Sequence, residues 1–563
     1  MSVSIRAYCA PTMVLLAFDW PDAPNHSDFL GFSITRTGSK SGAYVLRNRL
    51  TFKGPAEDGD VPSTAAPIQK FMWWDAGVRA SSGESYDYKV TPVLGTPDNL
   101  RMQDASAGTV HIELPSNIEN DIGTWFNRAV VSSQAFSTLL KSMNLDPAVP
   151  ASQLSQEQEL PLRAWLADGL EKIVPQFLST QKKIEGAIYH LTDKFWVIPT
   201  LEKSNNSIEL VYDSHLLYGG KGKPKKPSPN QDAINTLKDK KNVKFEPRDK
   251  TSIMHDKFLV RVGGSDKAEQ VLCGSANFTP EGFSSQANLL HTFNSPDLAN
   301  LFLARKRLIQ DNPSVVATAQ KADWSTPVKV GDASIRVFFS PEPKNKQVSI
   351  DTVIETIGKA TSSVVFCLYD PTDLQLLNAC FKVGDSGKMM FGLVNHILAQ
   401  DPQLDPSKRV LPAEISIYHR SRKNHDVLDA ESFGRDTPQG FLAEWKAFPG
   451  EDGKNYAPVI IHHKFIVIDG ETGSPRIYSG SANMSNNSVH RNDEALLEIT
   501  EIKSLAQLYL AEFMRLYENY RARAKFLRPE KNLKLAINSN WCKKYFSDNT
   551  PESRCRLALA KLI

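Results

Sequence analysis

Two segments of this chain match each other over about forty residues, and this internal repeat constrains the fold more than any other feature. Each copy has a histidine, a lysine two positions later and a Gly-Ser-Ala-Asn run: His255, Lys257 and 274–277 in the first, and His462, Lys464 and 480–483 in the second. The stretch from histidine to glycine is one residue longer in the first copy. Such a repeat predicts two structural units of one kind, each supplying an equivalent set of polar residues.

Each histidine stands just before a short apolar run typical of a β-strand. Side chains two positions apart share one face of a strand, so each histidine is expected beside the lysine of its own copy. If the copies face each other about a pseudo-twofold axis, two imidazoles flank one phosphorus atom and two ammonium groups surround its oxygens. This set supplies a nucleophile, an acid for the leaving alkoxide and fixed positive charge, as phosphodiester cleavage requires. The repeat has no surplus metal ligands, so we expect no metal and no cofactor.

These motifs resemble the H-x-K-x(4)-D and G-S-x-N signatures of the phospholipase D superfamily, and the resemblance covers roughly residues 181–500. It implies a two-step reaction, in which one histidine attacks phosphorus and the other protonates the leaving group and then activates water. The family's usual order makes His255 the nucleophile, through a phosphohistidine, and His462 the general acid. The resemblance also implies a set of phosphate- or substrate-binding residues: Lys257, Lys464, Asn277, Asn483, Ser275, Ser481 and Asn288.

Two positions depart from the family pattern, and the first is the signature aspartate. It is present as Asp469 in the second copy but is replaced by Val262 in the first. Asp469 opens an Asp-Gly turn dipeptide, whereas Val262 precedes two glycines that can turn without it. We therefore interpret Asp469 as structural, and its replacement in the first copy need not abolish activity.

The second departure is an amide opposite a carboxylate, eleven residues after the last Asn of each motif. Asn288 occupies this position in the first copy and Glu494 in the second. A carboxylate bonded to an imidazole favours the protonated ring, whereas an amide leaves it neutral. This predicts that Glu494 serves the acid His462 and that Asn288 serves the neutral nucleophile His255. A similar asymmetry is found in tyrosyl-DNA phosphodiesterases, although the rest of the chain does not resemble them.

The 563 residues exceed one ordinary domain, so we expect a multidomain chain. Short alternating runs between Gly and Pro predict an all-β sandwich at the N-terminus, and residues 83–93 resemble the penultimate strand of fibronectin type III domains. Later strands alternate with helical stretches, which predicts a duplicated α/β core. The expected regions are a sandwich (1–112), a helical connector (113–180), repeat one (181–325), repeat two (326–500) and a helical, basic C-terminal tail (501–563).

Composition adds only weak limits. The net charge of +3 gives no global argument for a polyanionic partner, so such an argument depends on local clusters. Six scattered cysteines without a C-x-x-C pair resemble buried thiols more than a disulfide framework or a zinc site. No stretch approaches the ~20 apolar residues of a membrane span, and none fits a signal-peptide core. We predict a cytoplasmic protein without a transmembrane segment.

Local charge favours nucleic acid as the substrate. Ten Lys or Arg residues against four acids lie between Gly219 and Lys250, and prolines among them suit an extended arm that attracts a polyanion. A second insertion, at about 419–459, holds further basic residues: Arg420, Arg422 and Lys423. Its aromatic residues keep phospholipid head groups open as an alternative substrate: Phe433, Phe441, Trp445 and Phe448. A third alternative is a catalytically weak, polyanion-binding protein whose sandwich recruits a protein partner.

Overall fold

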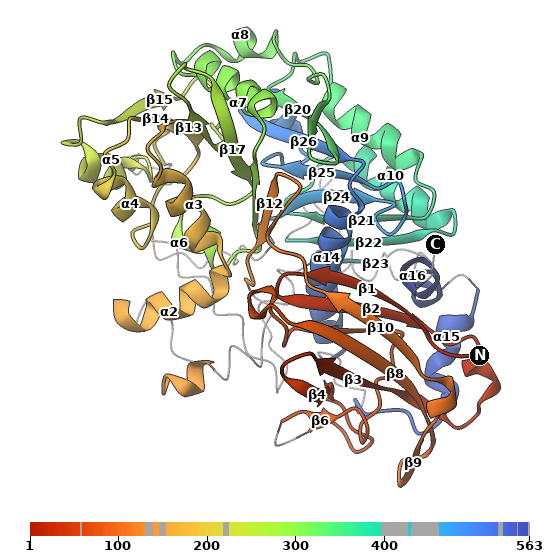
Figure 1. Cartoon of the computed structure of the whole chain (residues 1–563). Coiled ribbons are helices and arrows are strands. Elements are labelled where there is room, and N and C mark those ends of the chain that lie inside the picture. Colours follow the sequence, from red (N-terminus) through yellow and green to blue (C-terminus); the bar gives the residue numbers. More distant parts are fainter. Residues whose placement is uncertain are drawn as a thin grey trace.

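The computed structural model describes most of the chain, and Figure 1 shows its architecture. The described ranges are 1–56, 59–129, 139–145, 154–217, 225–395, 426–429, 461–526, 533–548 and 550–560. Within them an N-terminal pair of sheets is followed by two larger mixed sheets with helices packed on them. The chain is therefore multidomain, as expected.

The N-terminal region is built from two antiparallel sheets with an apolar cluster between them. One sheet has the order β1 (Ser4–Ala10), β2 (Met13–Asp19), β7 (Met72–Asp75). The other has the order β10 (Gly108–Glu113), β8 (Ser85–Thr96), β3 (Phe29–Gly38), β4 (Gly42–Val45), with β9 (Asn99–Met102) beside β8, and a small pair is formed by β5 (Arg47–Asn48) and β6 (Val61–Pro62). On β8, Tyr86, Tyr88 and Val90 are buried whereas Asp87 and Lys89 are exposed. The predicted strand alternation is confirmed.

Two eight-stranded sheets follow, and their strand orders correspond. The first has the order β11 (Ile118–Glu119), β12 (Ile122–Phe126), β18 (Leu289–Phe293), β17 (Ala268–Gly274), β16 (Lys257–Val262), β13 (Lys183–Ile188), β14 (Ile208–Asp213), β15 (Val243–Arg248). The second has the order β19 (Val328–Val330), β20 (Ala333–Ser340), β26 (Glu494–Thr500), β25 (Arg476–Gly480), β24 (Lys464–Ile468), β21 (Ser363–Leu368), β22 (Met389–Val394), β23 (Asp426–Asp429). In each sheet the strand that begins with the motif lysine lies between an antiparallel neighbour on either side.

Helices pack on both faces of these sheets. Those between β12 and β20 are α2 (Gln156–Ala167), α3 (Leu170–Leu178), α4 (Val197–Lys203), α5 (Gln231–Leu237), α6 (Pro280–Phe283), α7 (Pro296–Ile309) and α8 (Val315–Ala319). The later ones are α9 (Val348–Gly358), α10 (Leu374–Asp385), α13 (Asn486–His490), α14 (Lys503–Phe526), α15 (Lys543–Phe546) and α16 (Pro551–Ala560). One shared apolar cluster joins Phe258 of β16 to Phe465 of β24, together with α7 and α14. The two motif strands therefore meet across a common core.

The predicted C-terminal tail is helical, but it is not a separate tail. Helix α14 packs between the N-terminal sheets and the second large sheet, contacting β1, β2 and β21 to β24 (Figure 1). Its apolar stripe is buried: Leu505, Leu508, Phe513 and Leu516. Of the expected basic cluster, Arg521 forms ion pairs with Glu518 and Glu552, and the side chains of Arg523, Lys525 and Arg528 lie outside the described residues. An amphipathic stripe shows which side of a helix is buried, but it does not show what covers it.

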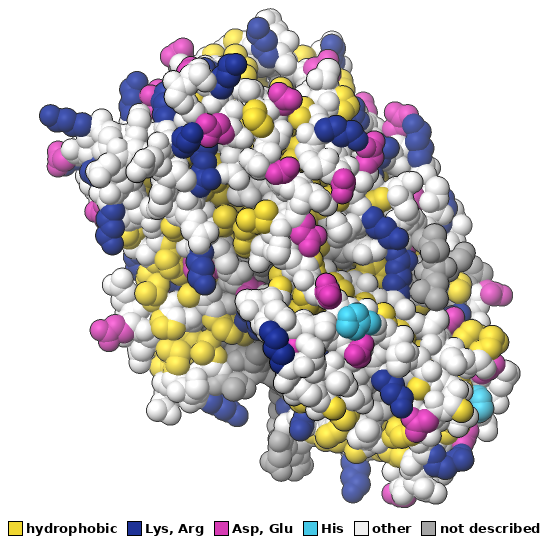
Figure 2. Space-filling model, viewed as in Figure 1, with side chains coloured by type: hydrophobic (Ala, Val, Ile, Leu, Met, Phe, Trp, Pro, Cys, Tyr) yellow, Lys and Arg dark blue, Asp and Glu magenta, His cyan; other side chains and the backbone are white. Residues whose placement is uncertain are grey.

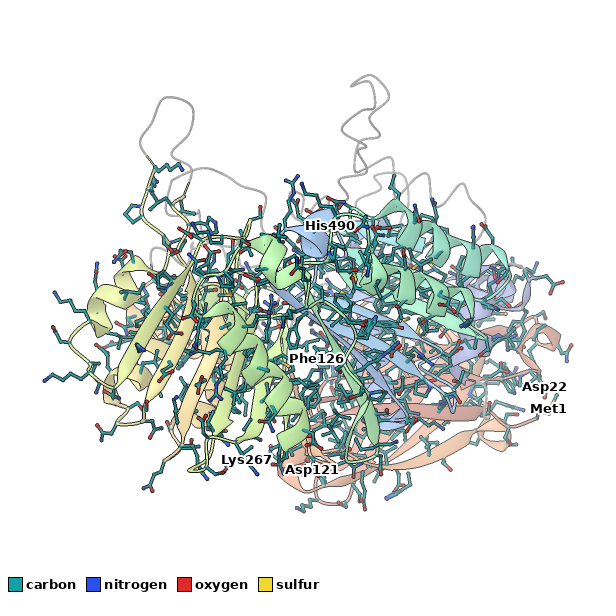
Figure 3. All side chains as sticks on the ribbon, turned by 90° about the horizontal axis from the view of Figure 1, so that it is seen from above. Met1, Asp22, Asp121, Phe126, Lys267 and His490 are labelled. Carbon is teal, nitrogen blue, oxygen red and sulfur yellow. The ribbon has the colours of Figure 1, made fainter. Side chains whose placement is uncertain are left out.

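The predicted helical connector is wrong at its start. Residues 118–126 form β11 and β12, and β12 extends the first large sheet by pairing with β18. Phe126, at the end of β12, lies near the middle of the molecule (Figure 3) and packs against His463 and Phe465. A short apolar run does not distinguish a helix from a strand, and here the pairing within the folded sheet makes it a strand. Among the described residues of the connector, helix is found later, at 139–142 and in α2 and α3.

The surface agrees with the small net charge. On the face drawn in Figure 2, basic and acidic side chains are interspersed, with no broad area of one sign. All six cysteines are free thiols, and five of them are buried. Within the described part of the chain, every helix is too short or too polar to traverse a lipid bilayer.

Candidate active site

Two short backbone contacts bring the halves of the predicted site together. Met254 forms a parallel bridge with Asp493, and Ala287 forms one with Ile461. Through them the His255 backbone N–H donates to the Asp493 carbonyl at 2.9 Å, and the His462 N–H donates to the Ala287 carbonyl at 3.1 Å. Each motif histidine is thus anchored by the backbone of the other repeat. This arrangement gathers both motifs into one centre.

The side-chain partners of the two histidines also come from the opposite repeat. Nδ1 of His255 lies 3.1 Å from Oε1 of Glu494, a contact that becomes an ion pair when the ring is protonated. Nδ1 of His462 lies 2.8 Å from Oδ1 of Asn288, a hydrogen bond. The predicted pairing, in which Glu494 serves His462 and Asn288 serves His255, is therefore wrong. The repeat alignment identified Asn288 and Glu494 as equivalent positions, but the two backbone bridges place each of them beside the histidine of the other repeat.

The crossed pairing suits an attack by His255. A carboxylate beside Nδ1 favours the tautomer with its proton on that nitrogen, which leaves Nε2 free as a nucleophile. The same carboxylate stabilises the positive charge that develops on the ring when Nε2 bonds to phosphorus. Burial and the Lys257 and Lys464 charges hold the pKa of His255 well below its usual range, so the ring is neutral. The same causes lower the pKa of His462.

Two buried lysines supply the positive charge of the centre. Nζ of Lys257 donates to the His255 carbonyl at 2.7 Å, and Nζ of Lys464 donates to the His462 carbonyl at 2.8 Å. Burial lowers the pKa of both, and the Lys257 charge adds to the effect on Lys464. Carboxylates oppose this lowering: Glu494 at both lysines, Asp256 and Asp213 at Lys257, and Asp370 at Lys464. A bound phosphodiester anion would add to the negative charge that favours the ammonium forms.

The Gly-Ser-Ala-Asn runs lie directly against these groups. The hydroxyl of Ser275 donates to Oδ1 of Asn288 at 2.9 Å, and that of Ser481 accepts from the Ala495 N–H at 3.0 Å. These two serines and Asn288 thus have hydrogen-bond partners within the protein, and their predicted binding of substrate stays a prediction. The side-chain oxygens of Asn277 and Asn483 are buried without a partner among the described residues. A phosphodiester anion only accepts hydrogen bonds, so the Nδ2–H groups of these amides, and not the unpartnered oxygens, remain candidates for contact with the phosphate.

Sequence reasoning missed two tyrosines beside the histidines. The Tyr189 ring lies 5.0 Å from that of His255, and the Tyr369 ring lies 5.1 Å from that of His462. Nζ of Lys257 is 5.0 Å from the Tyr189 ring centre and Nζ of Lys464 is 5.3 Å from that of Tyr369, within cation–π range. Each tyrosine directly follows the strand that pairs with its motif strand. Extending the repeat alignment upstream would have found both.

Asp469 is placed in the turn that the sequence predicted. Its φ of 53° lies in the left-handed region, and its carboxylate accepts hydrogen bonds from the backbone N–H groups of Thr361, Ser362 and Ser363 and from the Thr361 hydroxyl. These contacts tie the end of β24 to the start of β21. They fit a structural role.

Asp469→Ala is expected to destabilise the fold by about 2–4 kcal/mol, because it leaves buried donors unsatisfied and puts alanine in a strained conformation. Urea unfolding measures this loss. Asp469→Asn, which tolerates the left-handed region, should lose less. An unchanged unfolding midpoint in Asp469→Ala would contradict the structural role.

The predicted basic arm is only partly extended. Residues 231–237 form α5 and 243–248 form β15, so most of this basic segment is folded into the first repeat. Arg248 is fully buried and therefore cannot attract a polyanion. Lys221, Lys223 and the predicted basic and aromatic residues of the second insertion lie outside the described residues. Across the described ranges, no group of three or more His, Cys, Asp or Glu side chains suits a metal ion.

Two imidazoles, two ammonium groups and two asparagine amides are the kinds of group that phosphoryl transfer requires. Residues 353–517 match the family model described as "Cardiolipin synthase, PLD-like domain". The chain thus contains a phospholipase D-like domain, and the predicted resemblance is confirmed for this region. Among curated protein sequences, none is significantly similar to the chain.

Solved structures show remote likeness. Polyphosphate kinase from Porphyromonas gingivalis is 10% identical, covering 66% of this chain and 52% of its own, with a TM-score of 0.37. This chain therefore matches about half the length of that kinase. Phosphatidylserine synthase from Haemophilus influenzae is 12% identical, covering 69% and 90%, with a TM-score of 0.41. Yeast tyrosyl-DNA phosphodiesterase is 9% identical, covering 59% and 87%, with a TM-score of 0.33.

Proposed function

We propose that this chain is a metal-independent phosphodiesterase that works through a phosphohistidine intermediate. The observation that carries the proposal is the crossed pair of motif histidines, each held by the opposite repeat beside a buried lysine. We further propose that the corresponding strand orders reflect a duplicated unit with pseudo-twofold symmetry. The fibronectin-like character of the sandwich, its protein partner and the cytoplasmic location stay predictions.

In the first step Nε2 of His255 attacks phosphorus, and the bond from phosphorus to the leaving oxygen breaks. His462 gives its proton to that oxygen. Both rings are neutral in the free protein, so His462 must gain a proton when the substrate binds, and the phosphodiester anion beside it favours this gain. In the second step His462 takes a proton from water, the water oxygen bonds to phosphorus, and the bond to His255 breaks.

We favour nucleic acid as the substrate. Exposed lysines of the segment around α5 and β15 support this choice: Lys225, Lys226, Lys238, Lys241 and Lys244. A phospholipid head group is the second candidate, because Leu216 and Leu217 are exposed in the loop after β14 (56% and 45%). Exposed adjacent leucines of this kind suit contact with an apolar surface.

One assay separates these candidates. The purified protein is incubated with single-stranded DNA, duplex DNA, RNA or phosphatidylcholine vesicles, each with and without EDTA. We expect cleavage of nucleic acid that EDTA does not reduce. Turnover of lipid alone would replace the favoured substrate, and loss of activity in EDTA would overturn the metal-independent mechanism. If wild type and His255→Ala are equally active, the assignment of His255 is wrong, and if neither turns over any substrate, the chain is a binding protein.

Both the acid limb and the alkaline limb of the pH profile of kcat/KM should lie at lower pH than the ordinary pKa values of histidine and lysine. Because the pKa of His255 is held below its ordinary value, the nucleophile stays neutral as pH falls through 6.5. The lowered pKa values of Lys257 and Lys464 mean that their positive charge is lost, as pH rises, before the ordinary lysine value near 10.4. Steady-state rates from pH 4.5 to 10 test this. An acid limb with its midpoint at 6.5 would contradict the assignment.

A further inference from the structure

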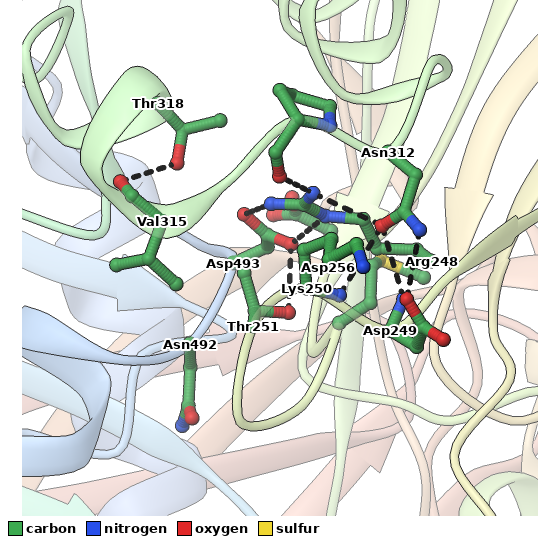
Figure 4. Close-up of polar contacts among 12 residues, drawn as sticks. Arg248, Asp249, Lys250, Thr251, Asp256, Asn312, Val315, Thr318, Asn492 and Asp493 are labelled. Atoms are coloured by element: carbon green, nitrogen blue, oxygen red, sulfur yellow. Dashed lines mark hydrogen bonds and ion pairs between the residues drawn. The ribbon is translucent and has the colours of Figure 1, made fainter.

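A network of buried ions includes Asp256, the residue that follows His255, and Figure 4 shows its members Arg248, Thr251, Asp256 and Asp493. Asp493 accepts from Nε of Arg248 at 2.7 Å, from Nη2 of Arg305 at 2.7 Å and from the Thr251 hydroxyl at 3.1 Å. Arg305 also reaches the Asp256 carboxylate at 3.5 Å. Asp493, Arg248 and Asp256 are fully buried, and Arg305 is nearly so. Removing one member of such a network would leave a buried charge without a partner, which is strongly destabilising. The network therefore holds its side chains in one geometry.

The network holds the backbone that sets the histidine against its carboxylate. The Asp493 carbonyl accepts from the His255 N–H at 2.9 Å, and the Asp493 N–H donates to the Ile253 carbonyl at 3.1 Å. The next residue is Glu494, which contacts the His255 ring. Because the side chain of Asp493 is held, the Asp493 carbonyl that accepts from the His255 N–H is held as well. The backbone of the next residue, Glu494, whose side chain contacts the His255 ring, is held with it.

The backbone bridge of the other histidine has no ionic side chain at the corresponding position. It joins Ala287 to Ile461, and both side chains are apolar and buried. Ala287 stands at the position equivalent to Asp493 and so adds no side-chain bond to the His462 anchor. Support there comes from other groups: the Ile461 N–H donates to Oδ1 of Asn395 at 3.0 Å, and His463 lies beside the ion pair of Glu512 with Arg515. The two halves differ here in a way that the motif residues do not reveal.

We propose that Asp493, held by Arg248, Arg305 and Thr251, is a positioning residue for the attack by His255. The proposal rests on the proposed function and deepens it. An attacking nitrogen must be aligned with the bond that breaks, and misplacement by about 1 Å can cost about 10²-fold in rate. His462 instead exchanges a proton with two different oxygens, the leaving group and the water. The ion network therefore acts on the first chemical step and much less on the second.

The test uses bis(4-nitrophenyl) phosphate with enzyme in excess over substrate. Nitrophenolate release reports the first step, and the appearance of 4-nitrophenyl phosphate reports the second. Asp493→Asn is expected to slow the first step by about 10–100-fold and the second by less than about threefold. The control is Glu185→Gln, which removes a carboxylate that is equally buried and faces Lys183, Lys306 and Arg307 in the same repeat. It should leave both steps within about twofold of wild type.

A milder pair of variants keeps the proposal testable if Asp493→Asn does not fold. Thr251→Val removes one hydrogen bond to Asp493 and should slow the first step several-fold, whereas Thr251→Ser should restore it. Equal slowing of both steps, or a smaller amplitude at an unchanged rate, would show a merely structural role and overturn the proposal. If wild type releases no nitrophenolate, the proposed function itself fails. If wild type reacts and these variants match it, only the positioning role fails.

Discussion

His255→Ala is expected to lower the turnover of bis(4-nitrophenyl) phosphate by about 10⁴-fold or more, because it removes the atom that bonds to phosphorus. The crossed geometry supports this assignment: His255 is neutral and its ring contacts the Glu494 carboxylate. The first release of nitrophenolate should disappear together with steady turnover. Rapid-mixing absorbance measures both.

The matched control is His111→Ala, which removes an exposed histidine from the N-terminal region. It should keep wild-type rates and a wild-type melting temperature. Residual activity of His255→Ala within about tenfold of wild type would show that another group attacks phosphorus.

His462→Ala should give a different result, which depends on the leaving group. Nitrophenolate leaves without a proton, so the first release should stay within about tenfold of wild type. A diester with an alkyl leaving group needs the acid, and its cleavage should fall by about 10²–10⁴-fold. Water is no longer activated, so the phosphoenzyme should accumulate. It should be labile in acid and stable in alkali, as a phosphohistidine is.

The two variants together decide the order of the histidines. If His462→Ala loses the first release while His255→Ala retains it, the roles are reversed. Glu494→Gln provides a further check, because it removes the carboxylate beside His255 while keeping the shape of the side chain. It should slow the first step on both types of substrate.

Much of the candidate site could be predicted because its signals are local. The apolar run after each motif predicted a strand, which begins at Lys257 with His255 two residues before it, and the second copy repeats the arrangement with His462 and Lys464. The alternation of β8 predicted its buried face for the same reason. In each case one strand geometry relates neighbouring residues, and no knowledge of distant segments is needed.

Other features could not be predicted because they depend on segments far apart in the chain. Within its own segment the short run at 122–126 pairs with just the two residues of β11, and its place beside β18 follows only from the folded sheet. Arg248 looked like part of a basic surface arm, yet it is buried against Asp493, 245 positions away. Charge in the sequence does not show whether its partner is water or a distant carboxylate.

By itself the sequence determined the inventory of the centre: two histidines, two lysines, two asparagines and one carboxylate opposite one amide. Only the tertiary structure decided which ring each of the last two contacts. The reason is physical: two equivalent half-sites can meet with their own partners or with exchanged ones. The bridges at Met254 and Ala287 exchange them, which places Glu494 against His255.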